Sequence, residues 1–195
     1  MHVLKGINLE IKAKEAVVIL GTKDAGKSTL LRCIHFLQKI DQGEIWFDGE
    51  KITKKQKEIG VILRHFNLFP HKTVLENVME GPTIVQKETK DKAAALGINL
   101  LEKVGLRERA YVYPKNLSIS EKQRVAIART LAMQPKIMLF DEPTSNLNPV
   151  LAEEIIGVIK QLHYDGMTVV ITANEVEFSH GFAYRTVLLE DGVII

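Results

Sequence analysis

The sequence contains one cysteine, Cys33, among 195 residues. A single thiol excludes a disulfide within the chain and fits a reducing compartment. Long apolar runs are also missing, because the longest, such as 16–20 and 137–140, have strand length and fall far below the roughly 18 residues that a membrane helix requires. The first residues, MHVLKG, lack an extended apolar stretch behind a basic start, so we expect no secretory signal.

An excess of one charge is absent as well. The chain has 26 basic and 24 acidic side chains, so its total charge gives no basis for electrostatic capture of nucleic acid or of an anionic membrane. We therefore expect no nucleic-acid partner. The length and the apolar content predict one sizeable globular domain with a real core.

Apolar strand-like segments alternate with helix-like segments along most of the chain, and this alternation predicts an α/β fold with a mainly parallel sheet flanked by helices. The dipeptides Asp48-Gly49 and Asp191-Gly192 predict tight hairpin turns. The expected strands cover 7–11, 16–20, 44–47, 136–140, 167–172, 186–189 and 193–195; the expected helices cover 28–38, 121–133 and 151–164, and Ala93, Leu96, Leu100 and Val104 form a further helical stripe.

The stretch GTKDAGKSTLLRC, residues 21–33, has the spacing of a phosphate-binding loop. A buried strand leads into it and a helix leaves it, so backbone N–H groups and the positive helix end can converge on a phosphate. Lys27 would reach the outer phosphates, and the Ser28 hydroxyl would bind Mg²⁺. The alternative is an ordinary strand-to-helix turn. The predicted nucleotide contacts are Gly21, Thr22, Lys23, Asp24, Ala25, Gly26, Lys27, Ser28 and Thr29.

The stretch IMLFDEP, residues 137–143, supplies the second half of such a site. Mg²⁺ needs oxygen ligands and an attacking water needs a base. Asp141 would hold the metal, directly or through water, and Glu142 would orient or deprotonate the water. An Asp-Glu pair at a strand end is also a common solvated cap, so its meaning depends on the phosphate loop.

These segments together resemble the ATP-binding subunit of an ABC transporter, most closely those of the polar amino acid importers of bacteria. The resemblance rests on VLKGINLEI, the 21–33 loop, HFNLFPHKTVLENVMEGP, LSISEKQRVAIARTLAMQPKIMLFDEPTSNLNP and the final EDG turn. It implies a P-loop NTPase core with an ABC-type helical subdomain at about 66–125 and a reduced antiparallel β subdomain. Residues 1–195 would form one nucleotide-binding domain, lacking the family's N-terminal strand with its adenine-stacking aromatic and the C-terminal end.

The resemblance also implies the cofactors ATP and Mg²⁺, with Lys27 and Glu142 as catalytic residues and Ser28 and Asp141 as metal ligands. It implies a head-to-tail dimer, homo- or heterodimeric, in which Ser118 of one subunit contacts the nucleotide of the other. Residues 66–82 would face transmembrane permease subunits. The chain would then lie in the cytoplasm, peripheral on the inner face of the cell membrane.

Several positions depart from the family pattern close to the nucleotide. LSISE replaces LSGGQ, so Ile119 and Ser120 stand at two glycine positions, where glycine allows close backbone approach and positive φ. Arg64 replaces a glutamine, and a guanidinium cannot coordinate Mg²⁺. Asn174 replaces the switch histidine, and an amide cannot carry the charge of an imidazole. Asn148 replaces the D-loop aspartate.

Asp24 also replaces a family glycine, inside the phosphate loop. Two unit charges about 4 Å apart at an effective dielectric near 20 repel by roughly 4 kcal/mol, enough to weaken nucleotide binding about a thousandfold. The repulsion is avoided if the Asp24 side chain points toward solvent or toward Lys23. The sequence thus predicts a phosphate loop that carries one unfavourable charge.

Two functions follow from these observations. The first is an ATPase subunit that couples ATP binding and hydrolysis to amino acid import through separate membrane subunits. The second is a non-hydrolysing nucleotide-binding or partner-binding module with the same fold, possibly one half of a heterodimer. A third hypothesis, an ABC-type ATPase that acts in DNA repair or on ribosomes, is not favoured. The short spacing between Phe66 and Ser118 leaves no room for a long coiled-coil insertion, and the balanced charge gives no basic stripe for nucleic acid.

Overall fold

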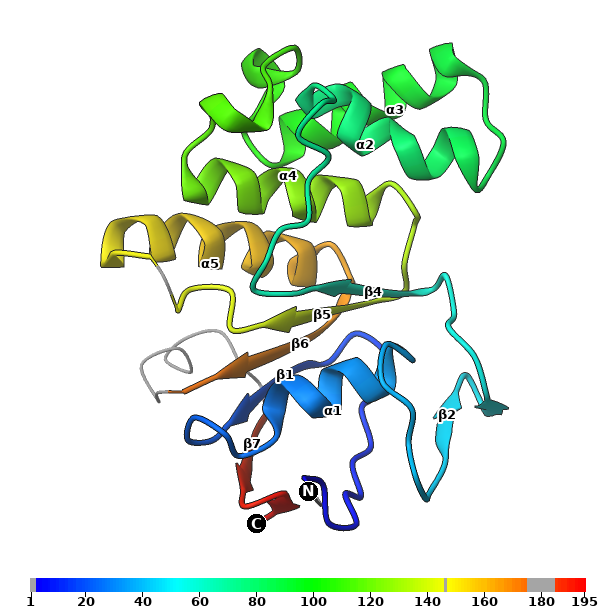
Figure 1. The fold of residues 1–195 in the computed structure, drawn as a ribbon, viewed down its shortest axis with the longest axis vertical. Helices are drawn as coiled ribbons and strands as arrows, with labels where there is room; N and C mark the ends of the chain where they lie inside the picture. Colours follow the sequence, from blue (N-terminus) through cyan, green and yellow to red (C-terminus); the bar gives the residue numbers. More distant parts are fainter. Residues whose placement is uncertain (1–2, 146, 175–184) are drawn as a thin grey trace.

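A six-stranded sheet, in the order β4-β5-β6-β1-β7-β8, forms the centre of the fold (Figure 1). The computed structural model describes residues 3–145, 147–174 and 185–195. All strand pairs of this sheet are parallel except β7 with β8, which confirms the predicted α/β class. The strands are β1 (Ala16–Leu20), β4 (Ile59–Ile62), β5 (Ile137–Asp141), β6 (Thr168–Ala173), β7 (Arg185–Glu190) and β8 (Val193–Ile194).

Helices cover both faces of the sheet. Figure 1 shows α1 on one face and α5 on the other, with α4, α2 and α3 stacked beyond α5. Every helix in the described part of the chain is too short or too polar to cross a membrane. The helices are α1 (Lys27–Ile34), α2 (Val74–Ile84), α3 (Lys90–Lys103), α4 (Ile119–Leu131) and α5 (Pro149–Tyr164), with short 3₁₀ turns at Arg107–Arg109 and Pro114–Asn116.

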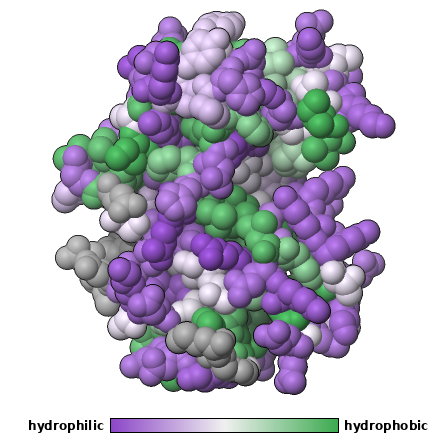
Figure 2. Space-filling view, viewed as in Figure 1, coloured by the Kyte–Doolittle hydropathy of each residue, from purple (hydrophilic) through white to green (hydrophobic). Residues whose placement is uncertain are grey.

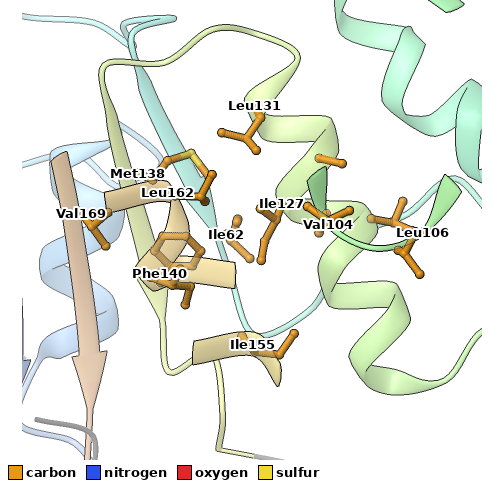
Figure 3. Packing of buried hydrophobic residues seen from close by; sticks show 14 of the residues in the cluster. Ile62, Val104, Leu106, Ile127, Leu131, Met138, Phe140, Ile155, Leu162 and Val169 are labelled. Carbon is orange, nitrogen blue, oxygen red and sulfur yellow. The ribbon is translucent and has the colours of Figure 1, made fainter. Parts of the chain in front are cut away.

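The apolar core consists of two clusters, one on each face of the sheet. Strand β1 contributes to both, because its side chains alternate between the two faces. Val18 belongs to a large cluster with Phe140 of β5, Ile127 of α4 and Ile155 of α5 (Figure 3). Ile19, one residue further, belongs to a second cluster on the α1 side. A strand buried on both faces reads as a continuous apolar run, which is why the residues 16–20 contain no polar side chain.

Both predicted Asp-Gly hairpins are present. Asp48 and Gly49 have φ of 50° and 79° between β2 (Ile45–Phe47) and β3 (Glu50–Ile52), which pair antiparallel. Asp191 and Gly192 have φ of 48° and 82° between β7 and β8. Two consecutive residues with positive φ are the geometry that turns a right-twisted hairpin in two residues.

The expected strand over 7–11 is wrong. Ile7, Leu9 and Ile11 are half-buried and alternate with exposed residues, but none of them belongs to a strand within the described residues. The alternation of apolar and polar residues shows which side chains face the core, but a strand also needs a neighbouring backbone to pair with. The segment is held differently, by a backbone bond from Lys5 N to Gly192 O at 2.7 Å and by a bond from the Arg185 guanidinium to Glu10 O.

Three helices also differ in detail from the expectation. Helix α1 ends at Ile34 instead of residue 38, because Phe36 adopts a φ of 57° and the chain turns away. Helix α4 begins at Ile119 and ends at Leu131, about two residues before the predicted bounds at each end. In α3 the most buried line runs through Ala93, Gly97 and Leu101, while the expected Leu96 and Leu100 lie half-buried beside it.

Candidate functional site

The carboxyl ends of four neighbouring strands meet at one edge of the sheet, and their loops carry the predicted site. Ile62 of β4 lies opposite Phe140 of β5, and Asp141 lies opposite Thr172 of β6. The loop 21–26 leaves β1, the strand beyond β6. Because parallel strands end together, segments more than 100 positions apart in sequence meet here. In α/β sheets this edge is where ligands bind.

The phosphate loop has two glycines that the fold requires. A Cβ atom on Gly21 would lie 2.3 Å from the carbonyl oxygen of Leu189, so any side chain there would displace a strand. Gly26 has a φ of 103° and caps the start of α1. The loop is fixed from the other side by the Gly192 N–H, which donates to Ala25 O at 3.2 Å. This sequence pattern therefore corresponds to a tightly defined backbone.

Lys27 begins α1 and points its ammonium group into the strand-end cluster. Nζ donates to Gly21 O, Thr22 O and Asn174 Oδ1, each at 2.8 Å, and lies 3.4 Å from Glu142 Oε1. The side chain is only 3% exposed. A buried ammonium needs this number of oxygen partners because desolvation is costly. The structure thus holds Lys27 within the loop, and its role toward phosphate stays a prediction.

Ser28 and Asp141, the two predicted metal ligands, are in direct contact. Ser28 Oγ donates to Asp141 Oδ1 at 2.7 Å, and Thr172 Oγ1 donates to the same oxygen at 3.2 Å. Asp141 is almost fully buried. Taken by themselves, this hydroxyl and this carboxylate offer the oxygen donors that Mg²⁺ prefers. The Arg64 guanidinium, however, lies 3.3 Å from Ser28 Oγ and 3.9 Å from Asp141 Oδ1 and opposes a second cation at the same place. No group of three or more His, Cys, Asp or Glu side chains that could hold a metal occurs among the described residues.

Glu142, the predicted base, is surrounded by three donors. Its Oε1 lies 2.6 Å from Arg64 Nη2, and its Oε2 accepts from Asn174 Nδ2 at 3.0 Å, in addition to the contact with Lys27. Its backbone has a φ of 46°, and its N–H donates to Thr172 Oγ1 at 3.0 Å. The arrangement fixes the carboxylate at the end of β5.

Thr172 is a site residue that the sequence reasoning missed. Its buried hydroxyl contacts both Asp141 and the Glu142 backbone, and it orients the two acidic residues. The available signal was a polar residue that follows the apolar run 169–171 inside the strand TVVITA. A buried hydroxyl needs hydrogen-bond partners, so such a position marks a polar neighbour.

Asp24 is exposed and has a φ of 73°. Aspartate tolerates the left-handed region better than most residues, which explains how the loop keeps its shape without the family glycine. Its neighbours Thr22 and Lys23 are also exposed, and Thr29 is half-buried on the first turn of α1. Solvent exposure screens the Asp24 charge, so the full repulsion calculated above is an upper bound.

The LSISE segment forms the start of α4. Ser118 Oγ accepts from the Glu121 N–H at 3.1 Å, and the Glu121 carboxylate accepts from the Ser118 N–H at 2.8 Å. Ile119 is half exposed, whereas Ser120 is fully buried and donates to Glu154 at 2.9 Å. Ser120 therefore faces the interior and Ile119 faces outward. Within the described residues the Ser118 side chain bonds to the Glu121 backbone and not to the phosphate loop, so its nucleotide contact stays a prediction.

Asn148 caps helix α5. Its Oδ1 accepts from the Leu151 N–H at 3.0 Å, and Pro149 follows as the first helical residue. Asparagine and aspartate are equally good N-caps, so the departure from the family aspartate preserves this end of the helix. Residue 146, in the same segment, lies outside the described residues.

Chemically, the cluster combines two cations, Lys27 and Arg64, with two carboxylates, Asp141 and Glu142. They lie beside a glycine-bounded loop and the N-terminus of α1, which carries partial positive charge. This arrangement can bind phosphate groups and a hard cation, and it can position a water beside a carboxylate. The site geometry thus suits a nucleoside polyphosphate.

Comparison with known proteins supports the same conclusion. The family model described as ABC transporter matches residues 4–145. The chain is 47% identical over 200 residues to the glutamine transport ATP-binding protein GlnQ of Escherichia coli K12, covering 99% of this chain and 83% of that protein. It is 42% identical to the arginine transport ATP-binding protein ArgV of Corynebacterium glutamicum, covering 100% of this chain and 84% of that protein.

Solved structures show the same fold. A dimeric ATP-binding cassette in a post-hydrolysis state, bound to ADP and Pi, superimposes with a TM-score of 0.86 at 35% identity, covering 98% of this chain and 88% of its own. The cbiO1 protein of Clostridium perfringens, part of the ABC transporter complex cbiONQ, gives a TM-score of 0.90 at 29% identity, covering 99% of this chain and 80% of its own.

Proposed function

Because the chain belongs to the ABC transporter family of ATPases, we propose that it is the ATP-binding subunit of an importer for polar amino acids. The observation that carries the proposal is the convergence of Lys27, Ser28, Asp141 and Glu142 at one edge of the sheet. The substrate class comes from the relatives, which are named for transport of glutamine and arginine. Solute choice itself would reside in other subunits.

In the proposed site, the backbone N–H groups of the 21–26 loop and Lys27 bind the β- and γ-phosphates of ATP. Ser28 and Asp141 are the side chains that would hold Mg²⁺, and the ion would offset phosphate charge there. Glu142 orients the attacking water. Lys27 would exchange its present carbonyl partners for phosphate oxygens, which offer a stronger, charge-assisted hydrogen bond.

A second subunit completes the site in this proposal. Ser118 lies at the N-terminus of α4, where partial positive charge and free N–H groups suit a phosphate. In a head-to-tail dimer it would contact the nucleotide held by the other subunit. The dimeric ATP-binding cassette with the same fold supports this assembly.

Membrane subunits would bind beside residues 66–82. A hollow next to this segment is lined by Leu37, Val61, Leu63 and Phe66 together with Arg129. Arg129 donates to the carbonyl oxygens of Asn67 and Phe66 at 2.7 and 2.8 Å and so fixes the shape of the segment. Figure 2 shows a patch of apolar side chains near the centre of one face, bordered mainly by hydrophilic side chains. Such a contact would place the chain on the cytoplasmic face of the membrane.

The test is ATP binding and turnover by the purified chain, compared with its Glu142→Gln variant. We expect ATP binding by both proteins and phosphate release by the unchanged chain alone, because the amide keeps the shape of Glu142 without acting as a base. Failure of both proteins to bind ATP would refute the proposal. Binding without turnover in either protein, even with permease subunits, would instead favour the non-hydrolysing module.

The importer assignment needs a separate measurement. Disruption of the gene should reduce uptake of one or more radiolabelled polar amino acids, and the intact gene should restore it. A Lys27→Ala copy should fail to restore uptake because the phosphate loop loses its cation. Unchanged uptake of every polar amino acid tested would contradict the substrate class without contradicting ATP binding.

A further inference from the structure

Arg64 places a positive charge on the oxygen atoms that form the proposed magnesium site. Its Nη2 lies 2.6 Å from Glu142 Oε1 and 3.3 Å from Ser28 Oγ, and its Nε lies 3.9 Å from Asp141 Oδ1. One guanidinium therefore lies within 4 Å of an oxygen atom of both proposed magnesium ligands and of the proposed base. Lys27 contacts only Glu142 among these three residues.

The backbone brings Arg64 to this position. Ile62 lies opposite Phe140 in the parallel pair of β4 and β5, so the residues two positions further, Arg64 and Glu142, leave the sheet side by side. The Arg64 side chain is 38% exposed, while the side chains of Asp141 and Glu142 are 1% and 3% exposed. The guanidinium thus covers the buried carboxylates and keeps an edge open to a ligand that enters from solvent.

The charges at the site are balanced without a metal ion. Asp141 and Glu142 contribute two negative charges, and Lys27 and Arg64 contribute two positive charges within 4 Å of them. A divalent cation on Ser28 and Asp141 would meet the guanidinium at close range, and like charges repel strongly where water is displaced. A phosphate group, by contrast, would gain a planar donor that suits its oxygens in a bidentate bond.

We infer that Arg64 takes over the charge-neutralising role of the divalent cation, so that this chain binds nucleotide without Mg²⁺. This inference rests on the proposed nucleotide site and specifies how the phosphate charge is neutralised there. The guanidinium binds the outer phosphates of the nucleotide directly. It also lowers the affinity of the site for divalent metal.

The first test measures ADP binding by isothermal titration calorimetry, once with Mg²⁺ and once with EDTA. ADP is chosen because no turnover can change its concentration. For the unchanged chain we expect dissociation constants that agree within about threefold, and for Arg64→Gln a loss of at least about tenfold in EDTA, because an amide carries no charge to replace the ion. Arg64→Lys should retain part of the metal-independent binding, since it keeps the charge and loses the planar fork.

Arg107→Gln is the matched control. Arg107 also forms an ion pair, with Glu102 at 2.7 Å, but on an exposed surface formed by α3 and the 107–109 turn. Its replacement removes the same charge and should leave unchanged the ratio of the ADP dissociation constants measured with Mg²⁺ and with EDTA. Thermal unfolding of each variant checks that the fold is intact. The comparison of ADP binding with Mg²⁺ and with EDTA can also be made on the unchanged chain, without any variant.

The second test measures the metal itself, with Mn²⁺ in place of Mg²⁺ and electron paramagnetic resonance as the readout. In the presence of ADP, Arg64→Gln should bind Mn²⁺ at least about tenfold more tightly than the unchanged chain, because the competing cation is gone. Equal Mn²⁺ affinities in the two proteins would overturn the inference.

The outcomes separate the two proposals. Similar ADP affinity with and without Mg²⁺ supports both the nucleotide site and the role of Arg64. ADP binding that occurs with Mg²⁺ but not with EDTA overturns the role of Arg64 and leaves the nucleotide site in place. The absence of ADP binding under both conditions overturns both.

Discussion

Lys27 Nζ lies 3.4 Å from Glu142 Oε1, and both side chains are 3% exposed. The contact joins the start of α1 to the end of β5 across 115 positions of sequence, from residue 27 to residue 142. A buried ion pair stabilises little by itself because desolvation offsets the attraction, but loss of one partner leaves an uncompensated charge. Lys27 therefore connects the stability of the fold to the proposed binding of phosphate.

Lys27→Ala should weaken ADP binding about a hundredfold and lower the free energy of unfolding by about 3 kcal/mol. The carbonyl oxygens of Gly21 and Thr22 lose their buried donor, and Glu142 keeps Arg64 as its remaining cation. Calorimetry and urea denaturation measure the two effects. Lys103→Ala is the control, since Lys103 forms an exposed ion pair with Asp165. This substitution should lower the free energy of unfolding by less than about 1 kcal/mol. Nucleotide affinity equal in Lys27→Ala and the unchanged chain would contradict the proposed role.

Asp24→Gly should strengthen ADP binding by about tenfold, because it removes an exposed, partly screened negative charge from the phosphate loop. The change in the free energy of unfolding should stay below about 1 kcal/mol. Asp48→Gly provides the comparison, since Asp48 has a similar backbone at φ 50° in a hairpin with no predicted nucleotide contact. An equal gain in affinity from both substitutions would show that charge in the loop is not the cause.

Ser118→Ala should lower the free energy of unfolding by about 1 kcal/mol, because α4 loses the hydroxyl that caps Glu121 N–H. Thr73 forms the same capping box at the start of α2, with Glu76 as its partner. Thr73→Ala should cost a similar amount. If Ser118 also binds phosphate, only its variant should weaken ATP-dependent dimerisation, measured by analytical ultracentrifugation.

His35 should make the fold less stable in mild acid. Burial lowers the pKa of His35 from 6.5 to about 4, and the nearby Lys55 charge adds to this shift. The unfolded chain therefore binds more protons between these values, and the stability present above pH 6.5 is lost as the pH falls toward 4. From these pKa values, the loss between pH 7.5 and pH 5 is about 2 kcal/mol.

Urea denaturation at pH 7.5 and pH 5 measures this loss. His35→Gln should reduce the pH dependence by about 2 kcal/mol because the amide does not titrate. An identical pH dependence in His35→Gln and the unchanged chain would contradict the assignment.

Gly21→Ala should lower the free energy of unfolding by about 2 kcal/mol, since its Cβ would overlap the Leu189 carbonyl at 2.3 Å and force strand β7 to shift. Gly157→Ala should have the opposite effect and stabilise the fold by up to about 1 kcal/mol. Gly157 lies inside α5, and nothing stands within 4 Å of the new Cβ. Thermal and urea unfolding of the two variants test the contrast.

The sequence by itself determined the features that depend on neighbours along the chain. The phosphate loop is local because glycine spacing and a following helix define it, and both hairpins follow from Asp-Gly dipeptides that accept positive φ. Buried strands could be identified from continuous apolar runs. The family resemblance added the expected fold and function, which the comparisons confirmed.

Only the tertiary structure decided which distant side chains meet. The register of β4, β5 and β6 placed Arg64 and Thr172 against Asp141 and Glu142, and no local pattern contains that register. The predicted strand at residues 7–11 is absent for the same reason. Alternation of apolar and polar residues shows which side chains face the core, but it does not show whether a neighbouring backbone is there to pair with. Local spacing fixes backbone shape through steric limits, whereas charge compensation at a site depends on contacts that the sheet creates when it assembles.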